Sequence, residues 1–330
     1  MKINADPYRI DLKRPFRLAT GSRNHTNVVY IHLSSGPLTS VGEASLPPYL
    51  GESIESVVAF ANSINPSKLN PENLEDSRSY LDGFHDDNLA AKAGIEMALV
   101  SMAAKMKQQG VGEFFGITDR PIETSYTIGI SEKEEMKEKL AEAAPFKTLK
   151  LKLGSADDLA LLRTFREMTD KPFSVDVNQG WGSLEMALPI VQLLEEMNCL
   201  FIEQPFHAED IPSHAKLKEI TEIPIFADES IKRLKDLREH AAAFDGVVVK
   251  LMKSTGPIEA VEMLREAKQL GLKTVMGCMA ESSVSVAMAR AIAPLADYAD
   301  LDGPFLIKGD PYGFVIYEGG KIGYSDARYQ

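Results

Sequence analysis

Three acidic residues follow short β-rich runs in the middle of the chain. Asp176 lies in FSVDVN, Glu203 in CLFIEQP and Asp228 in IPIFADES. If these runs are neighbouring parallel strands about 4.8 Å apart, the carboxylates meet at one edge and repel each other unless a cation lies between them. Hard oxygen donors favour Mg²⁺, and no histidine stands at a strand end to favour zinc. The alternative is that each is an ordinary helix N-cap or surface acid.

Three lysines stand in or at the end of similar runs. Lys150 and Lys152 alternate with leucines in TLKLKLG and share one face of the expected strand, and Lys250 follows the apolar run GVVV. Each lysine alone has an ordinary alternative, a solvated strand face or an end that snorkels to solvent. Together, Lys152 and Lys250 fall on the second and sixth of eight expected strands, which lie on opposite sides of a closed barrel.

Amines on opposite sides of a substrate favour removal of a proton from one face of a carbon and its return to the other. Positive charge from the cation and from Lys150 is expected to lower a lysine pKa, so that a neutral amine is available near pH 7. The metal would stabilise the enediolate formed when a carboxylate substrate loses its α-proton.

The elements that must position these residues repeat regularly. From residue 124 onward, β-rich runs recur about every 24–25 residues, and amphipathic segments such as SLEMALPIVQLLEEM separate them. The runs occupy residues 124–130, 148–154, 173–178, 199–205, 223–230, 246–252, 273–279 and 297–302. Strands that alternate with helices indicate βαβ units and a parallel sheet. Eight units predict an α/β barrel, or a variant without its last helix. An open doubly wound sheet is the alternative, but no glycine-rich phosphate fingerprint follows the first strand.

The two ends of the chain have other patterns. The N-terminal part predicts strands over 2–12 and 28–33, loops over 19–27 and 45–53, and helices near 53–63 and 88–109, which is typical of a small α+β unit. The segment 313–325 predicts a hairpin that turns at Gly319-Gly320, and we expect this tail to pack on the N-terminal unit. The expected divisions are 1–118 (capping domain), 119–303 (barrel) and 304–330 (returning tail).

Composition excludes several classes of protein. The 330 residues carry 36 Lys plus Arg and 48 Asp plus Glu, a formal charge of −12, which argues against a nucleic-acid binder. No apolar run is long enough for a membrane span, and the N-terminus has no secretory h-region. Cys199 and Cys278 are the only cysteines, which favours two buried thiols in a reducing cytoplasm.

These motifs identify a family. The Lys-x-Lys of TLKLKLG, with DVNQGW, FIEQP, ADES and VKLMKSTG, resembles the muconate-lactonising subgroup of the enolase superfamily over nearly the whole chain. The resemblance implies a modified TIM barrel, (β/α)7β, with an N-terminal α+β capping domain that the C-terminal tail completes. It implies Mg²⁺ on the three acids (Asp176, Glu203 and Asp228), Lys152 and Lys250 as acid and base, and Lys150 on the substrate carboxylate. Such enzymes often form homo-oligomers.

The Asp300-Leu301-Asp302 motif distinguishes reactions within the subgroup. Two carboxylates at i and i+2 on the last strand can hold an ammonium ion, and this motif resembles dipeptide epimerases, where it binds the free α-amino group. Thr127 and the segment Cys278, Met279 and Ala280 match positions that contact the dipeptide in those isomerases. The alternatives are a cycloisomerase, a succinylbenzoate synthase or an N-acylamino acid racemase, whose substrates have no ammonium group, with the two aspartates merely capping a turn. A non-catalytic barrel is disfavoured by the complete set of ligands and bases.

The cap loops are expected to select the side chain of the second residue of the dipeptide. Epimerases that act on Ala-Glu resemble this chain along KRPFRLATG but carry an arginine at the position of Gly21. Arg23 is two residues away, and a loop arginine is often only solvated. We therefore predict a neutral second residue, as in Ala-Ala or similar Ala-Xaa dipeptides, with an Ala-Glu substrate as the alternative.

Overall fold

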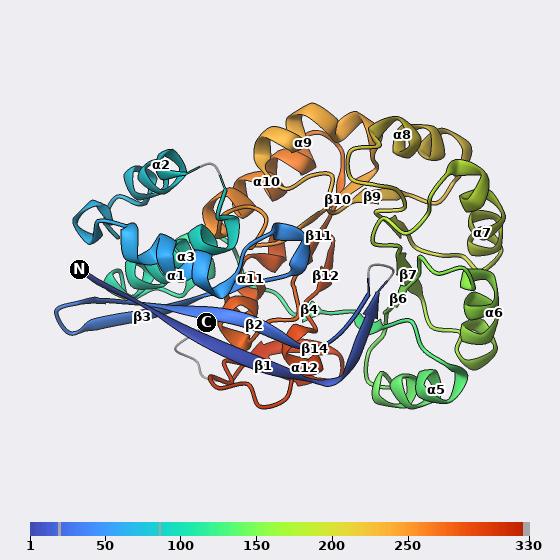
Figure 1. Ribbon diagram of the computed structural model, residues 1–330, viewed down its shortest axis with the longest axis horizontal. Coiled ribbons are helices and arrows are strands. Elements are labelled where there is room, and N and C mark those ends of the chain that lie inside the picture. Colours follow the sequence, from blue (N-terminus) through green and yellow to red (C-terminus); the bar gives the residue numbers. More distant parts are fainter. Residues whose placement is uncertain (19–20, 86, 326–330) are drawn as a thin grey trace.

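The computed structural model describes residues 1–18, 21–85 and 87–325. Its N-terminal part combines a three-stranded antiparallel sheet with four helices (Figure 1). The elements are β1 (Lys2–Leu18), β2 (Gly21–Ser35), β3 (Leu38–Ser45), α1 (Ile54–Ser63), α2 (Leu74–Phe84), α3 (Leu89–Met106) and the short α4 (Val111–Phe114). Strand β2 pairs with both β1 and β3, and α3 packs across β2 and β3. This is the α+β unit that the sequence predicts.

Several N-terminal elements differ from the prediction. Strands β1 and β2 extend well beyond residues 2–12 and 28–33, so the predicted loop 19–27 is β-strand from Gly21 onward, and its first two residues lie outside the described ones. Strand β3 and helix α2 were not predicted. The sequence of β3, LTSVGEAS, is small and polar because α3 packs directly on it: a Cβ on Gly42 would collide with the carbonyl oxygen of Gly94.

The central part is an eight-stranded parallel sheet in the order β12-β11-β10-β9-β8-β7-β6-β5. Its strands are β5 (Tyr126–Ile128), β6 (Leu149–Lys152), β7 (Phe173–Asp176), β8 (Ile202–Glu203), β9 (Ile225–Ala227), β10 (Gly246–Val249), β11 (Lys273–Gly277) and β12 (Tyr298–Asp300). All eight lie within the predicted runs. The backbone amide of Ser125, just before β5, donates to the carbonyl of Ala299 in β12 at 3.0 Å, which brings the two ends of the sheet together.

Seven helices separate the eight strands and form the outer ring seen in Figure 1. They are α5 (Lys133–Glu142), α6 (Asp158–Met168), α7 (Leu184–Glu196), α8 (Ile211–Ile220), α9 (Leu234–His240), α10 (Pro257–Gln269) and α11 (Ser283–Ile292). After β12, the only helix within the described residues is the four-residue α12 (Gly303–Leu306). The predicted (β/α)7β arrangement is therefore confirmed, with a short turn of helix in place of the eighth full helix.

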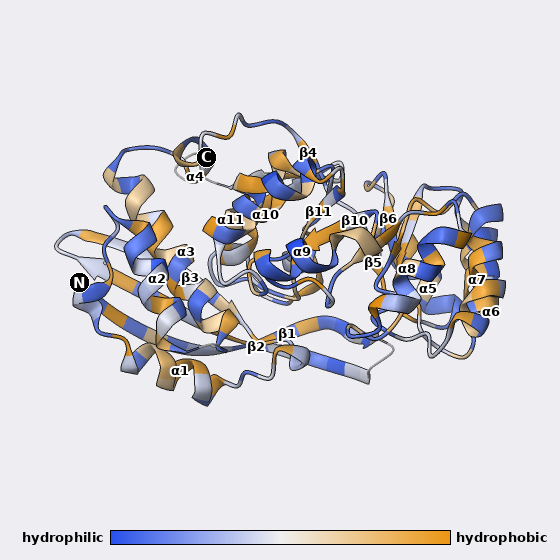
Figure 2. Ribbon diagram, turned by 90° about the horizontal axis from the view of Figure 1, so that it is seen from above, coloured by the Kyte–Doolittle hydropathy of each residue, from blue (hydrophilic) through white to orange (hydrophobic). Residues whose placement is uncertain are grey.

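The strands divide their side chains between two environments. Leu149 and Leu151 of β6 point outward into the main hydrophobic core against the helices, whereas Phe201, Phe226 and Val248 form a separate small cluster. The rings of Phe201 and Phe226 stack at 4.3 Å between centroids. Figure 2 shows β10 in the hydrophobic colour at the centre of the molecule, while the helices of the outer ring alternate hydrophilic and hydrophobic bands. Lys150 and Lys152 alternate with the leucines and therefore face the opposite side.

The tail reaches both other parts of the molecule. Strands β13 (Val315–Glu318) and β14 (Lys321–Tyr324) form the predicted hairpin, and β14 pairs with β4 (Ile122–Glu123), just before the first barrel strand. The stretch before the hairpin lies on the N-terminal sheet, where Ile307 forms a bridge with Leu12 and Tyr312 contacts Tyr30 edge to face. No helix in the part of the chain that the structure describes is long and apolar enough to cross a membrane.

Candidate active site

A cavity of about 470 Å³ lies where the carboxyl ends of the barrel strands meet the N-terminal cap. The barrel contributes Thr127, Lys150, Lys152, Asn178, Gln179, Asp228, Glu229, Lys250, Cys278, Met279, Ala280, Asp300, Asp302 and, beyond the last strand, Leu306; the cap contributes Gly21, Ser22, Arg23, Pro47, Pro48 and Tyr49. The predicted site residues thus come together around one space. Asp176 and Glu203 are the exceptions, because they are fully buried beneath the lining.

The three acids lie at the ends of successive strands, but they are not all level. Asp176 of β7 lies directly opposite Glu203 of β8 in the sheet register. Glu203 in turn lies opposite Phe226, so Asp228 stands two residues farther along. A displacement of two residues keeps a side chain on the same face of its strand. The stagger of strands in a barrel therefore still directs all three carboxylates inward.

Lysine amines hold these acids in place. The Nζ of Lys150 lies 3.0 Å from Oδ2 of Asp176, 2.8 Å from Oε2 of Glu203 and 2.8 Å from Oδ2 of Asp300. Lys152 donates to the same Oδ2 of Asp176 at 2.5 Å. The amine of Lys150 is therefore the cation that bridges the carboxylates of three strands in this structure.

The second expected base has a matching arrangement across the barrel. Lys250 follows β10 and donates to Oδ2 of Asp228 at 2.6 Å. Burial lowers the pKa of Lys250, but the Asp228 carboxylate more than offsets this and the pKa lies well above its ordinary value. The sequence led us to expect a lowered lysine pKa. For Lys250, the charges of the protein alone raise the pKa instead.

The charge balance of this end of the barrel favours an added cation. Its buried charged residues are Asp176, Glu203, Asp228, Glu229, Asp300, Asp302, Lys150, Lys152, Lys250 and Lys253, so acids outnumber lysines by two. Burial, together with the nearby charge of Asp176, raises the pKa of Glu203 to about 8. Within the described residues, no three acidic, histidine or cysteine side chains already stand as a ready-made metal cluster. The donor set nevertheless fits Mg²⁺, because all three acids offer hard oxygens in a buried, acid-rich setting.

The two aspartates of the last strand have different partners. Asp300 accepts hydrogen bonds from Lys150 at 2.8 Å and from the Ser125 hydroxyl at 2.7 Å. Asp302 accepts from the backbone amide of Thr127 at 2.7 Å. Burial and the neighbouring Asp300 charge raise the pKa of Asp302 to about 7, whereas Lys150 outweighs burial and lowers the pKa of Asp300. Among the described residues, Asp300 forms an ion pair and Asp302 does not.

The cap places an arginine over the cavity. Arg23 lies on β2 and lines the cavity beside Gly21 and Ser22, and its Nε is buried without a hydrogen-bond partner among the described residues. Burial lowers the pKa of this guanidinium. The end of the hairpin is tied to the barrel, since Arg17 forms an ion pair of 2.8 Å with Glu135 of α5. Arg23 is thus part of the cavity wall, not a solvated loop residue.

Several site residues were not predicted. Tyr49 lines the cavity from the cap, and its hydroxyl lies 3.4 Å from Sδ of Met279. Lys253 is completely buried and donates to Oδ1 of Asp228 at 2.6 Å. The Oε1 of Gln204 accepts from the backbone amide of Asp228 at 2.8 Å. Lys253 and Gln204 belong to quoted motifs, VKLMKSTG and FIEQP, whereas nothing in the sequence around Tyr49 signals its position.

Comparison with known families covers most of the chain. Residues 3–116 match the family described as mandelate racemase / muconate lactonizing enzyme, N-terminal domain, and residues 132–310 match the family described as enolase C-terminal domain-like. An L-Ala-D/L-Glu epimerase of Bacteroides thetaiotaomicron is 38% identical over 329 residues, which are 99% of this chain and 86% of that protein. An L-Ala-D/L-amino acid epimerase of Pedosphaera parvula is 34% identical over 336 residues, with 99% and 97% covered.

A solved structure adds the same relation in three dimensions. A dipeptide epimerase from Enterococcus faecalis V583, complexed with Mg and the dipeptide L-Leu-L-Tyr, matches with a TM-score of 0.92 and 26% identity over 99% of this chain and 97% of that one. The chain therefore belongs to the mandelate racemase / muconate lactonizing enzyme family of the enolase superfamily. It is an isomerase, and the family resemblance inferred from its motifs is confirmed.

Proposed function

We propose that the protein is a Mg²⁺-dependent dipeptide epimerase that inverts the α-carbon of the C-terminal residue by a two-base 1,1-proton transfer. The observation that carries this proposal is the pair Lys152 and Lys250. Both line one cavity, from the second and the sixth strand of the barrel, and each is hydrogen-bonded to an expected metal ligand. A substrate between them presents one face of its α-carbon to each amine.

The two lysines would exchange roles with the direction of reaction. The neutral amine of one takes the α-proton, the electron pair moves into the adjacent carboxylate, and the ammonium of the other returns a proton to the opposite face. Lys150, whose amine lies among three carboxylates, would orient the substrate carboxylate. When bound to Asp176, Glu203 and Asp228, Mg²⁺ would stabilise the negative charge that develops on the carboxylate oxygens.

Asp302 supports a substrate with a free amino group. Asp302 forms no ion pair among the described residues, so a substrate ammonium ion can act as its charged partner. A charge-assisted hydrogen bond of this kind is strong. Thr127, Cys278, Met279 and Ala280 line the same cavity. A cycloisomerase or succinylbenzoate synthase would leave Asp302 without this partner, which favours a dipeptide.

The side chain of the second residue is a finer question. The prediction of a neutral residue depended on Arg23 staying away from the substrate, and the structure gives Arg23 a place in the cavity wall with its Nε unpaired. A buried guanidinium N–H without a partner is costly, and a carboxylate relieves that cost. This observation favours the acidic alternative, so we propose an Ala-Glu-like dipeptide as the preferred substrate and a neutral Ala-Xaa dipeptide as the second candidate.

Incubation of a dipeptide library in D₂O with Mg²⁺ tests both levels of this proposal. Mass spectrometry reads exchange of the α-proton, and chiral chromatography reads inversion at the second residue. Lys152→Ala and Lys250→Ala should each abolish inversion while leaving exchange from one epimer. Full epimerase activity in both variants would contradict the two-base assignment, and exchange in N-acylated but not free dipeptides would favour an N-acylamino acid racemase.

The cavity is large enough for a small peptide, and the acidic charge of the chain disfavours binding of a polyanion. We therefore propose a dipeptide as the only partner of this site. Free thiols at Cys199 and Cys278 support the proposal that the enzyme acts in the cytoplasm. Assembly into a homo-oligomer stays a prediction.

A further inference from the structure

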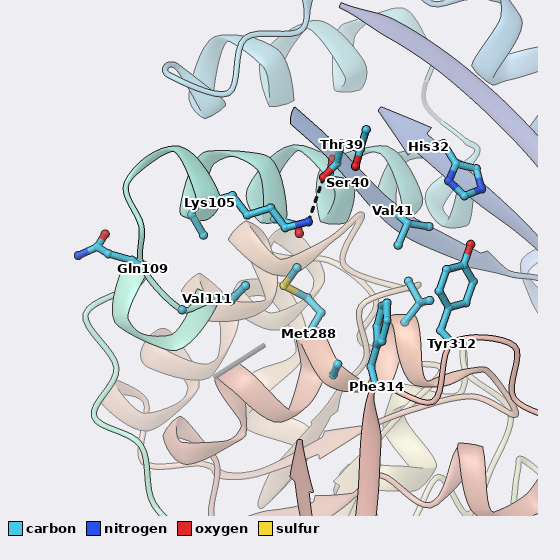
Figure 3. Close-up of a pocket in the computed structure, with 15 residues that line it drawn as sticks. His32, Thr39, Ser40, Val41, Lys105, Gln109, Val111, Met288, Tyr312 and Phe314 are labelled. Carbon is cyan, nitrogen blue, oxygen red and sulfur yellow. Dashed lines mark hydrogen bonds between the residues drawn. The ribbon is translucent and has the colours of Figure 1, made fainter. Parts of the chain in front are cut away.

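A second cavity, of about 290 Å³, lies between the cap and the barrel and shares no lining residue with the first. The cap contributes β2, β3, α3 and the start of α4, and the barrel side contributes α11 and the tail before β13. Figure 3 shows how these side chains converge from opposite sides. Its lining includes His32, Ser40, Lys105, Val111, Met288 and Phe314. Cavities between domains are common places for small-molecule sites.

One buried polar group in this cavity has no partner. Ser40 of β3 is only 5% exposed, and its Oγ makes no hydrogen bond to any described residue. A hydroxyl that is removed from water without a partner destabilises the fold, so native proteins nearly always pair such groups. Because Ser40 lines the cavity, an occupant with a hydrogen-bond acceptor or donor is the group that can pair it.

The charges around the cavity identify the occupant as an anion. Lys105 of α3 reaches the cavity, and its Nζ donates to the backbone oxygen of Thr39 at 2.9 Å, the bond drawn dashed in Figure 3. This bond fixes the ammonium next to Ser40. His32 is the other titratable nitrogen of the lining, and among the described lining residues there is no aspartate or glutamate. A carboxylate can therefore pair with a cation and a hydroxyl in this cavity, whereas an amine finds no acidic partner in the described lining.

The rest of the wall is apolar. Val111 and Met288 lie across the cavity from Lys105 and Ser40 in Figure 3, and the ring of Phe314 stands beside them. These side chains suit a hydrocarbon or aromatic body of a few carbon atoms. The active-site cavity differs, because there the acidic pair of the last strand is suited to an ammonium group.

We propose that this second cavity is a binding site for a small monocarboxylate with an apolar body and no amino group. The carboxylate pairs with the Lys105 ammonium and the Ser40 hydroxyl, and the apolar body packs on Met288 and its neighbours. An occupant contacts β3 of the cap and α11 of the barrel at once. Because it bridges these two elements, the occupant stabilises the packing of the cap on the barrel. Helix α11 begins at Ser283, shortly after Cys278–Ala280 of the active-site wall.

Ligand-observed NMR titration of the full chain with 3-phenylpropanoate tests this site. The expected result is saturable binding at one site, about tenfold weaker after Lys105→Met because a charge-assisted hydrogen bond is lost. Ser40→Ala should weaken binding by a smaller factor. Lys137→Met, on the exposed face of α5, is the matched control and should leave the affinity unchanged.

Two comparisons separate this site from the active site and from non-specific uptake. The amine 3-phenylpropan-1-amine, equal in size and opposite in charge, should not bind, and L-Ala-L-Glu should not displace the carboxylate. Absence of saturable binding, equal binding of the amine, displacement by the dipeptide or an unchanged affinity in Lys105→Met would each overturn the proposal. Because binding is read directly, these results do not depend on whether the enzyme epimerises dipeptides.

Discussion

Replacing Asp302 with Asn tests the proposal that this carboxylate holds the amino group of a dipeptide substrate. The amide keeps an oxygen that can accept from the Thr127 backbone amide, now at 2.7 Å, but it removes the negative charge that faces the cavity. A hydrogen bond to a charged group contributes about 1.5–3 kcal/mol. At about 1.4 kcal/mol for each factor of ten, kcat/KM for a free dipeptide should fall roughly 12- to 140-fold. Most of the change should be in KM, because the proposed binding mode places Asp302 at the amino end of the substrate, away from the α-carbon that reacts.

The pH profile gives this prediction a second, independent readout. In the folded enzyme the pKa of Asp302 is raised to about 7, so the carboxyl is largely protonated below that pH and must ionise to pair with an ammonium. Wild-type kcat/KM should therefore decrease as pH falls through about 7, and the variant should lose one proton of this dependence. Exchange kinetics in D₂O over pH 5–9 measure both quantities, with Asp170→Asn, at an exposed loop position, as the control. Unchanged kcat/KM and an unchanged profile would refute the reasoning.

Three further variants test other parts of the structure. Arg23→Gln should reduce kcat/KM for Ala-Glu at least tenfold relative to Ala-Val, because the loss is specific to a charged partner; equal losses on both dipeptides would count against a contact with the second residue. Lys253→Met breaks a buried ion pair to Asp228 and should lower the free energy of unfolding by about 3–5 kcal/mol, and it should also weaken Mg²⁺ binding in a calorimetric titration. Glu281 is buried with Oε2 unpaired, and burial and the charge of Glu43 raise its pKa to about 8. The folded protein binds this proton more tightly than the unfolded chain, so the free energy of unfolding falls as pH rises from about 4.5 to 8. Glu281→Gln should therefore raise the free energy of unfolding by about 1–3 kcal/mol at pH 8 and leave it unchanged at pH 5. An equal gain in stability at both pH values would exclude this explanation.

The barrel was predictable because its signals are local and repeated. A charged residue at the end of an apolar strand, such as Lys250 after GVVV, is informative wherever the strand order is known, because the C-terminal ends of parallel barrel strands share one mouth. The alternation of leucines with Lys150 and Lys152 correctly indicated that the two lysines share one face of their strand, and this face lines the cavity. The predicted strands and the hairpin at Gly319-Gly320 follow from the same kind of pattern.

The cap was less predictable because its elements depend on tertiary contacts. Residues 21–27 are polar and rich in Asn and Ser, and they form strand only because β1 pairs with them. Gly42 interrupts β3 in the sequence pattern, yet it is needed where α3 passes close by. Tyr49 lines the cavity from a segment that carries no recognisable motif. Arg23 reaches the cavity because it lies on a long hairpin, and the sequence pattern of this region predicted a loop. The proposed contacts with the second residue of the substrate lie in just these elements, so the local sequence pattern gave little guide to the preference for that residue.

The site itself shows a different limit of sequence reasoning. Motifs locate the carboxylates and the lysines but say nothing of how they pair, and the pairing changes their chemistry. Asp300 and Asp302 form one motif, yet Lys150 neutralises the first and leaves the second with a raised pKa. The pair therefore divides its work, because only one carboxylate has charge left to offer an ammonium ion. Asp300→Asn should consequently affect the position of Lys150 and lower kcat, whereas Asp302→Asn should raise KM, and steady-state kinetics on one dipeptide distinguish these two outcomes.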